Sequence, residues 1–142
     1  MHIGSRLLFA AALLAPLALP AQSLPRTASP AAAEAYLIAP ADGAVVGREV
    51  TVRFGLKGMG VAPAGTAVAD TGHHHLLIDT ALPSLDQPIP ADAQHVHFGK
   101  GQTETTITLS PGKHTLQLLL GDQNHVPHDP VVASAVVTVT VK

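Results

Sequence analysis

The sequence contains no cysteine, and this absence excludes several classes of functional site. None of its 142 residues can form a disulfide or supply a thiolate. A disulfide-stapled scaffold, a thiolate metal site, an iron–sulfur cluster, c-type haem attachment and a cysteine nucleophile are therefore excluded for this chain. Any tight metal site that it forms must use nitrogen and oxygen ligands.

Aromatic and charged residues are also scarce. Aromatic residues make up 3% of the sequence, with no tryptophan and one tyrosine, and charged residues make up 13% with a net charge of −2. Proteins that bind nucleic acid usually present a basic patch and aromatic side chains on which bases can stack. The composition therefore predicts no nucleic-acid partner.

The N-terminal residues have the pattern of a secretory signal peptide. Arg6 precedes an apolar run over residues 7–19, and small residues near Ala21 and Ser23 offer cleavage after either position. The run is shorter than the roughly 20 residues of a membrane-spanning helix, and a lipoprotein would need a cysteine at the cleavage point. We therefore expect residues 1–23 to be a signal peptide, and the mature protein to be periplasmic or secreted with no membrane span.

Residues 24–34 are rich in alanine and proline and have no apolar period, so they are interpreted as a flexible leader. Residues 35–142 are predicted to form the folded domain. Apolar residues there alternate with polar ones, which is typical of strands with one buried face. The clearest strands are expected over residues 50–56, 106–109, 116–120 and 137–141, with shorter ones over 35–38 and 74–79.

These strands predict an all-β fold, an immunoglobulin-like β-sandwich of about seven strands, with a small barrel as the competing shape. Pro111-Gly112 between two alternating runs indicates a β-hairpin. Residues 57–71 and 82–94 are aperiodic and rich in glycine, proline and alanine, so they are predicted to be loops. Loops on a rigid sandwich commonly carry binding groups.

Histidine, in contrast, is abundant: the chain has nine histidines, and only His2 precedes residue 73. His73 and His75 share one face of a predicted strand, as do His95 and His97 further along, because successive side chains of a strand point to opposite faces. Val96 and Phe98 are expected to point inward. The strand over 74–79 has leucine on both faces, and we favour His74 pointing into the core.

A third histidine tract lies in a loop that two prolines stiffen. His125 and His128 are three residues apart, and Asp122 and Asp129 flank them. Prolines limit the conformations of such a loop and can preorganise side chains that converge. His114, which follows the Pro-Gly turn, is expected to face solvent without a special role.

These tracts admit two interpretations. Imidazoles suit copper and zinc, and nearby aspartates can complete or orient a ligand set. Met59 could add a thioether to a copper site, although we favour a role in which its side chain only packs beneath the loop as a plug. In the other interpretation the histidines only form hydrogen bonds that order loops. The candidate metal ligands are His73, His75, His95, His97, His125, His128 and Asp129.

Four segments carry long motifs: residues 72–80 (GHHHLLIDT), 97–105 (HFGKGQTET), 110–122 (SPGKHTLQLLLGD) and 124–130 (NHVPHDP). Together with the loop 58–65 (GMGVAPAG), they resemble a bacterial family of small secreted or periplasmic proteins of unknown function. The resemblance covers about residues 50–142 and departs from the family where Val131 replaces a second proline. More distantly, the tracts are similar to immunoglobulin-like periplasmic domains associated with copper or the cell envelope, which implies His73, His75 and His125 as aligned histidines.

The sequence thus predicts a histidine-rich binding module for a divalent transition metal, copper or zinc, used for buffering, delivery or sensing. The alternative is a non-catalytic structural or interaction domain of the cell envelope, which recognises a protein or glycan partner and whose histidines only order its loops by hydrogen bonding. No recognisable catalytic motif occurs, and Gly99-Lys100-Gly101 lacks the helix and spacing of a phosphate-binding loop. An enzyme is therefore not expected, although three histidines with an open position could in principle serve a metal-dependent hydrolase.

Overall fold

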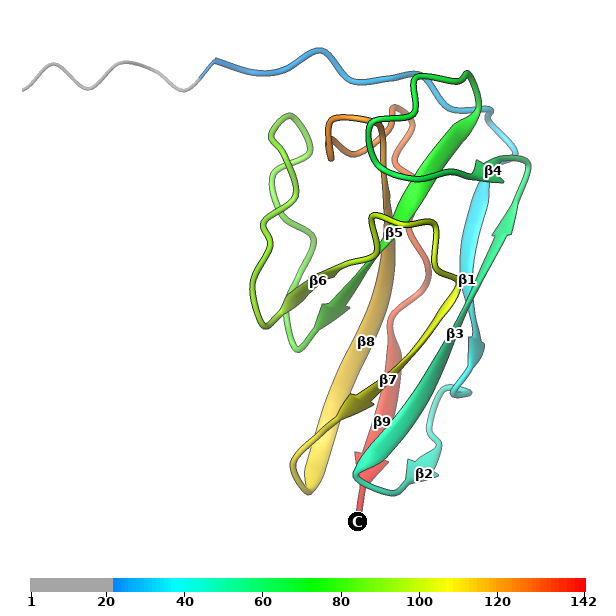
Figure 1. Ribbon diagram of the computed structural model, residues 1–142. Coiled ribbons are helices and arrows are strands. Elements are labelled where there is room, and N and C mark those ends of the chain that lie inside the picture. The colour runs from blue at the N-terminus through cyan, green and yellow to red at the C-terminus, as the bar shows by residue number, and fades with distance from the viewer. Residues whose placement is uncertain (1–21) are drawn as a thin grey trace, which may run out of the picture.

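A computed structural model describes residues 22–142 and shows an all-β domain (Figure 1). Within this range no helix is present, and none is therefore long and apolar enough to cross a membrane. The predicted signal peptide, apart from its last two residues, lies outside the described part. The prediction of a β-sandwich is confirmed for the domain that follows.

Two sheets form the sandwich. Strands β1, β3 and β7 make an antiparallel sheet in which β3 is central, and the second sheet has the order β2-β9-β8-β5-β4, with β6 added on β5. The strands of the described chain are β1 (Glu34–Ala39), β2 (Val45–Val46), β3 (Glu49–Lys57), β4 (Gly60–Val61), β5 (Thr71–Ile78), β6 (His95–His97), β7 (Glu104–Thr108), β8 (Gly112–Gly121) and β9 (Val137–Val141).

The main core lies between the two sheets and follows the alternation in the sequence. Val50, Val52 and Phe54 of β3 are buried while the residues between them are exposed, and β9 buries its three valines. Leu116, Leu118 and Leu120 of β8 belong to the same cluster. Burial of apolar area at about 25 cal/mol per Å² is the main stabilising contribution in such a core. A closed barrel does not form.

Strand β5 is buried on both faces, which explains why its sequence carries leucine on both. Its inner face places His74 and Leu76 in the main core, and the ring centroid of His74 lies 5.2 Å from that of Phe54. On the outer face Leu77 packs with Ile89 and Leu119 in a second, smaller cluster. The inward orientation of His74 is confirmed, and His73 and His75 lie on the other face.

The predicted hairpin at Pro111-Gly112 is wrong. Strand β7 pairs with β3, whereas β8 pairs with β5 and β9, so this turn carries the chain from one sheet to the other. A hairpin would place both apolar runs side by side in one sheet. The crossing instead lets Leu109 and Leu116 enter the core from opposite sheets, and Gly112 adopts a positive φ that permits the turn.

The segment before β1, predicted to be a flexible leader over 24–34, lies along one end of the domain. The amide of Leu24 donates to Asp86 O at 2.9 Å, and Thr27 O accepts a hydrogen bond from the amide of Asp129 at 2.9 Å. Glu34 already belongs to β1. In Figure 1 this blue segment crosses the end of the sandwich opposite to the C-terminus, close to the orange loop that follows β8.

Residues 57–71 and 82–94 form mainly loops, as expected. The first contains the short strand β4, which pairs in parallel with the start of β5. The second follows β5 and leads into β6, and its Ile89 amide donates to His125 O at 2.8 Å. The second loop is thereby fixed to the loop after β8.

Candidate metal centre

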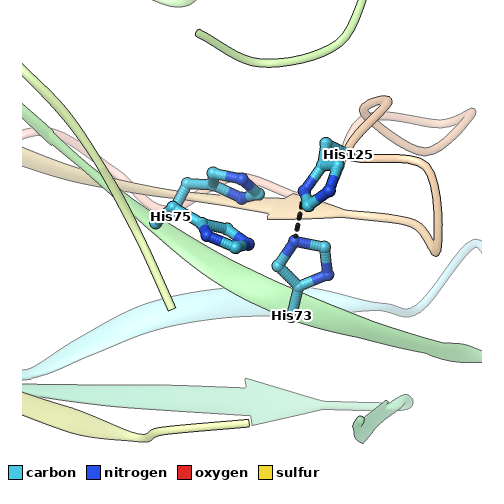
Figure 2. Close-up of side chains that lie close together, drawn as sticks. His73, His75 and His125 are labelled. Atoms are coloured by element: carbon cyan, nitrogen blue, oxygen red, sulfur yellow. Dashed lines mark hydrogen bonds between the residues drawn. The ribbon is translucent and has the colours of Figure 1, made fainter. Parts of the chain in front are cut away.

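Four imidazoles converge on the outer face of the larger sheet. His73 and His75 come from β5, His97 ends β6, and His125 lies in the loop after β8. One ring nitrogen from each residue lies within 4.8 Å of those of the other three. Figure 2 shows the rings of His73, His75 and His125 facing a common space. Imidazole nitrogens alone make a ligand set that suits zinc, copper, nickel and iron.

The strand register brings the first three rings together. His73 and His75 share a face because they are two residues apart on β5. His97 lies directly opposite His75 in the antiparallel β5–β6 pair. Cross-strand neighbours of this kind have Cβ atoms about 5 Å apart, and the ring centroids of His75 and His97 are separated by 5.1 Å.

Asp122 shapes the loop that carries the fourth ring. Its Oδ1 accepts hydrogen bonds from the amides of Asn124 at 2.8 Å and Val126 at 3.0 Å, while its Oδ2 accepts one from Thr27 Oγ1 at 2.5 Å. Within this turn His125 adopts a positive φ of 66°. Such a conformation is costly for a residue with a Cβ. The carboxylate therefore stabilises the backbone that points His125 at the cluster.

The rings are packed against one another rather than against polar groups. The centroid of His73 lies 4.7 Å from that of His75 and 5.0 Å from those of His97 and His125. One hydrogen bond joins two of the rings, between His73 Nε2 and His125 Nδ1 at 3.1 Å (Figure 2). His75 Nδ1 is buried and has no hydrogen-bond partner among the described residues. Such a nitrogen costs free energy unless a ligand engages it.

Two glycines leave the space that these rings occupy. A Cβ at Gly121 would lie 2.8 Å from Cε1 of His75, and one at Gly99 would overlap with the imidazole of His97. Sequence reasoning did not identify either glycine as part of the site. For Gly99 the available signal is its position two residues after His97. Gly121 lies opposite His73 in the β5–β8 pair, and this register cannot be read from the sequence.

Desolvation favours the neutral, metal-binding form of three of these imidazoles, those of His73, His75 and His97. Desolvation, followed by the proximity of His125 and His97, lowers the pKa of His73 to about 4. Desolvation and then the neighbouring histidines lower the pKa of His75 to about 3. The pKa of His97 is also lowered, first by desolvation and then by His125. A neutral imidazole keeps a lone pair available for coordination.

The spread of the nitrogens is close to that of a coordination sphere. Tetrahedral coordination at about 2.1 Å places ligand nitrogens roughly 3.4 Å apart, against at most 4.8 Å here. A contraction on the order of 1 Å is within reach of side-chain rotation. His97 is exposed and His125 half-buried, so these two rings can move most easily.

A pocket of about 240 Å³ opens onto the cluster from the loop side. His75, His97 and His125 form one wall, and the loop before β6 supplies the remaining lining. His73 does not line the pocket and is only 1% exposed. The cluster therefore has a closed side at His73 and an open side toward the pocket. The lining residues from the loop are Pro88, Ile89 and Ala91.

The other predicted ligands do not join this cluster. His95 shares the face of His97 but lies opposite Leu77, and its Nδ1 contacts Asp92 Oδ1 at 2.8 Å. His128 is fully buried, and its Nε2 donates to Thr71 O at 3.2 Å. Asp129 points to solvent and forms an ion pair with Arg26 at 3.6 Å. Met59 packs on the main core, in agreement with its favoured role as a loop plug.

His114 is not the solvent-facing residue that the sequence suggested. Its side chain is 12% exposed, with Nδ1 2.6 Å from Asp79 Oδ2 and Nε2 2.8 Å from Ser110 O. The hydrogen bond with Asp79 is the main cause that raises the pKa of His114. Ser110 Oγ lies 3.4 Å from Nε2, but Nε2 donates to the closer carbonyl and cannot accept the hydroxyl proton. The array therefore ties β8 to the end of β5 and lacks the geometry of a catalytic triad.

Comparison with known proteins gives one family. The model of a family described as a domain of unknown function (DUF4399) matches residues 52–142. No curated protein and no solved structure matches the chain. The matched residues include all four histidines of the cluster and the sandwich from within β3 onward, without β1 and β2.

Proposed function

The chain belongs to this family of domains of unknown function, and from its histidine cluster we propose that it is a binding module for a divalent transition metal. His73, His75, His97 and His125 would hold one ion, copper or zinc. Binding would serve to buffer, deliver or sense the metal rather than to catalyse a reaction. The signal-like N-terminal residues support a periplasmic or extracellular location.

The convergence of four imidazoles around one space carries this proposal. Isolated histidines in strands usually bond to the backbone, as His128 does. The cluster instead brings four rings together with one hydrogen bond between them and leaves His75 Nδ1 without a partner. One ring nitrogen of each residue lies within 4.8 Å of those of the other three, so the arrangement fits one ion that all four rings share.

Calorimetric titration of the purified protein with Cu(II), Zn(II) and Ni(II) tests the proposal. We expect one equivalent of at least one metal to bind with a dissociation constant well below about 100 μM, the range that several imidazoles together normally reach. His73→Ala or His125→Ala should weaken binding by at least about tenfold. His95→Ala is the matched control, because His95 lies on the same strand as His97 but outside the cluster. Binding no tighter than that limit for all three metals would end the proposal.

A second candidate function rests on the hydrogen bond between His73 and His125. In this alternative the module is a cell-envelope domain that recognises a protein partner, and its histidines order the loops. His73→Ala and His125→Ala would then lower the thermal stability equally with and without chelator. For a metal module, the loss should be larger in the presence of metal, because binding to the native state stabilises it.

A further inference from the structure

We propose that the bound metal accepts a fifth ligand from the pocket, in addition to the four imidazoles, and that this ligand is the carboxylate of a small monocarboxylic acid. This inference rests on the proposed metal site and adds an external ligand to it. The pocket is lined by three of the four cluster histidines and by Pro88, Ile89 and Ala91.

The open side of the site follows from the positions of the rings. His73 and His75 are each 1% exposed and lie on the sheet, whereas His97 is exposed and His125 half-buried. An ion held among the four nitrogens is covered by the sheet on the His73 side. On the opposite side it faces the pocket of about 240 Å³. An additional ligand can therefore approach without displacing a histidine.

The charge balance selects an anion. Imidazoles that bind a metal through a ring lone pair are neutral ligands, and the coordinating group contains no carboxylate. A divalent ion would therefore keep its positive charge in a partly buried site, where an unbalanced charge is costly. An anionic ligand would reduce that charge.

The acidic side chains of the surrounding loops do not join the coordinating group. Both oxygens of Asp122 accept hydrogen bonds from the loop and from Thr27. Oδ1 of Asp92 accepts hydrogen bonds from the amides of Gln94 and His95 and contacts the His95 ring, which lies outside the cluster. We therefore look for the anion outside the chain.

The size and lining of the pocket select the class of anion. Pockets for drug-sized ligands measure roughly 300–1,000 Å³, and this one is smaller. Apart from the imidazoles, its wall is made of proline, isoleucine and alanine side chains. These surfaces suit a short aliphatic tail and offer no charged group to a second carboxylate. Acetate and propionate are the simplest members of this class.

The experiment titrates propionate into Cu(II)-loaded protein at fixed pH and follows the visible and electron paramagnetic resonance spectra of the metal. We expect a saturable change with a dissociation constant of about 1 mM or tighter. Ala91→Leu should weaken propionate binding by about tenfold or more, because the larger side chain fills the pocket. Ala93→Leu is the matched control, since Ala93 is exposed on the same loop and does not line the pocket. All samples are compared at equal Cu(II) loading.

The outcomes distinguish a failure of the external carboxylate ligand from a failure of the metal site itself. If Cu(II) binds but propionate causes no saturable change, the external ligand is refuted while the metal site stands. An equal loss of propionate affinity in the Ala91 and Ala93 variants would refute the pocket as its location. If no metal binds, the proposed function itself fails, and this inference fails with it.

Discussion

At the scale of single residues, His74 is the clearest departure from an ordinary sandwich core. Its ring is fully buried between the sheets against Phe54, and neither ring nitrogen has a hydrogen-bond partner among the described residues. Desolvation lowers its pKa to about 4. The residue therefore contributes to the fold as a neutral, partly apolar side chain whose polar atoms cost free energy.

His74→Leu should stabilise the protein. Leucine fills a similar volume and removes two unpaired polar atoms from the core, so we expect the free energy of unfolding at pH 7 to rise by about 1–2 kcal/mol. Urea denaturation of the two proteins measures this change. A Leu76→Ala variant, which creates a cavity in the same strand and face, should instead lose roughly 2–5 kcal/mol. A destabilised His74→Leu protein would show that the ring has a partner in solution.

A substitution at Gly99 can displace the ring of His97 without disturbing the rest of the fold, because a Cβ at Gly99 would overlap with that ring. Gly99→Ala forces the exposed His97 ring to move, so the protein should lose about tenfold or more in metal affinity with little change in melting temperature. Gly47→Ala is the control, because a Cβ there meets nothing within 4 Å. Calorimetry and thermal melts of the two variants test this, and equal metal affinities would remove His97 from the ligand set.

The ion pair of His114 with Asp79 predicts that the stability of the protein depends on pH, because the pKa of His114 is raised whereas those of His73 and His75 are lowered. The pKa of His114 is raised above 6.5, first by the hydrogen bond with Asp79. Its stabilising contribution is therefore complete below pH 6.5 and is lost as the pH rises through the folded-state pKa. His114→Gln should lower the free energy of unfolding at pH 6 by up to about 1 kcal/mol, given solvent screening at this partly exposed pair, and by less at pH 9. Urea denaturation at both values checks this, and a larger loss at pH 9 would contradict it.

At the scale of elements, the segment before β1 acts as a strap across two loops. Residues 22 and 24 contact the loop before β6, through Gln87 and Asp86. Arg26 donates to the carbonyls of Pro127 and His128 in the loop after β8. The strap thus joins the loop that lines the pocket to the loop that carries His125.

Thr27→Val tests this strap without altering its shape. The hydroxyl of Thr27 donates to Asp122 Oδ2 at 2.5 Å, and valine removes that donor from a buried carboxylate. We expect a loss of about 1–2 kcal/mol in stability and a severalfold weaker metal affinity, because Asp122 holds the turn of His125. Thr51→Val, on an exposed position of β3, is the control. Unchanged metal affinity in the Thr27 variant would show that the turn of His125 is stable without this contact.

The long strands could be predicted because each has one buried face and a period of two. Strands β2 and β4 could not, since two residues leave no period. At β6 the alternation predicts that His95 and His97 share a face, but the strand with which β6 pairs depends on tertiary contacts. The hairpin predicted at Pro111-Gly112 is wrong because the sequence indicates the turn but not the sheet that each flanking strand joins. That choice depends on long-range packing.

The site was predictable in part for a similar reason. The alternation on β5 places His73 and His75 on one face from sequence alone. The choice of His97 over His95 depends on the β5–β6 register, since His97 lies opposite His75 and His95 opposite Leu77. The choice of His125 over His128 depends on the turn that Asp122 stabilises. Neither the register nor the turn geometry can be derived from residue spacing.

At the scale of the whole molecule, the histidine cluster and three connecting segments gather on one part of a rigid sandwich. The segment before β1 and the loop after β8 lie at the end away from the C-terminus, and the loop before β6 extends along the side of the larger sheet toward that end (Figure 1). Hydrogen bonds join all three segments. The sheets fix His73 and His75, while the loops supply His125 and the pocket wall. This division places rigid ligands beside more adjustable ones.

X-ray absorption spectroscopy of the protein loaded with one equivalent of Zn(II) or Cu(II) tests the central claim most directly. The account predicts a first shell that includes four nitrogens at about 2.0–2.1 Å with the multiple-scattering pattern of imidazole rings. In a His73→Ala, His125→Ala double variant, that imidazole signal should fall or the metal should be lost. A first shell of oxygen alone, or a spectrum unchanged in the double variant, would contradict a metal site formed by these histidines.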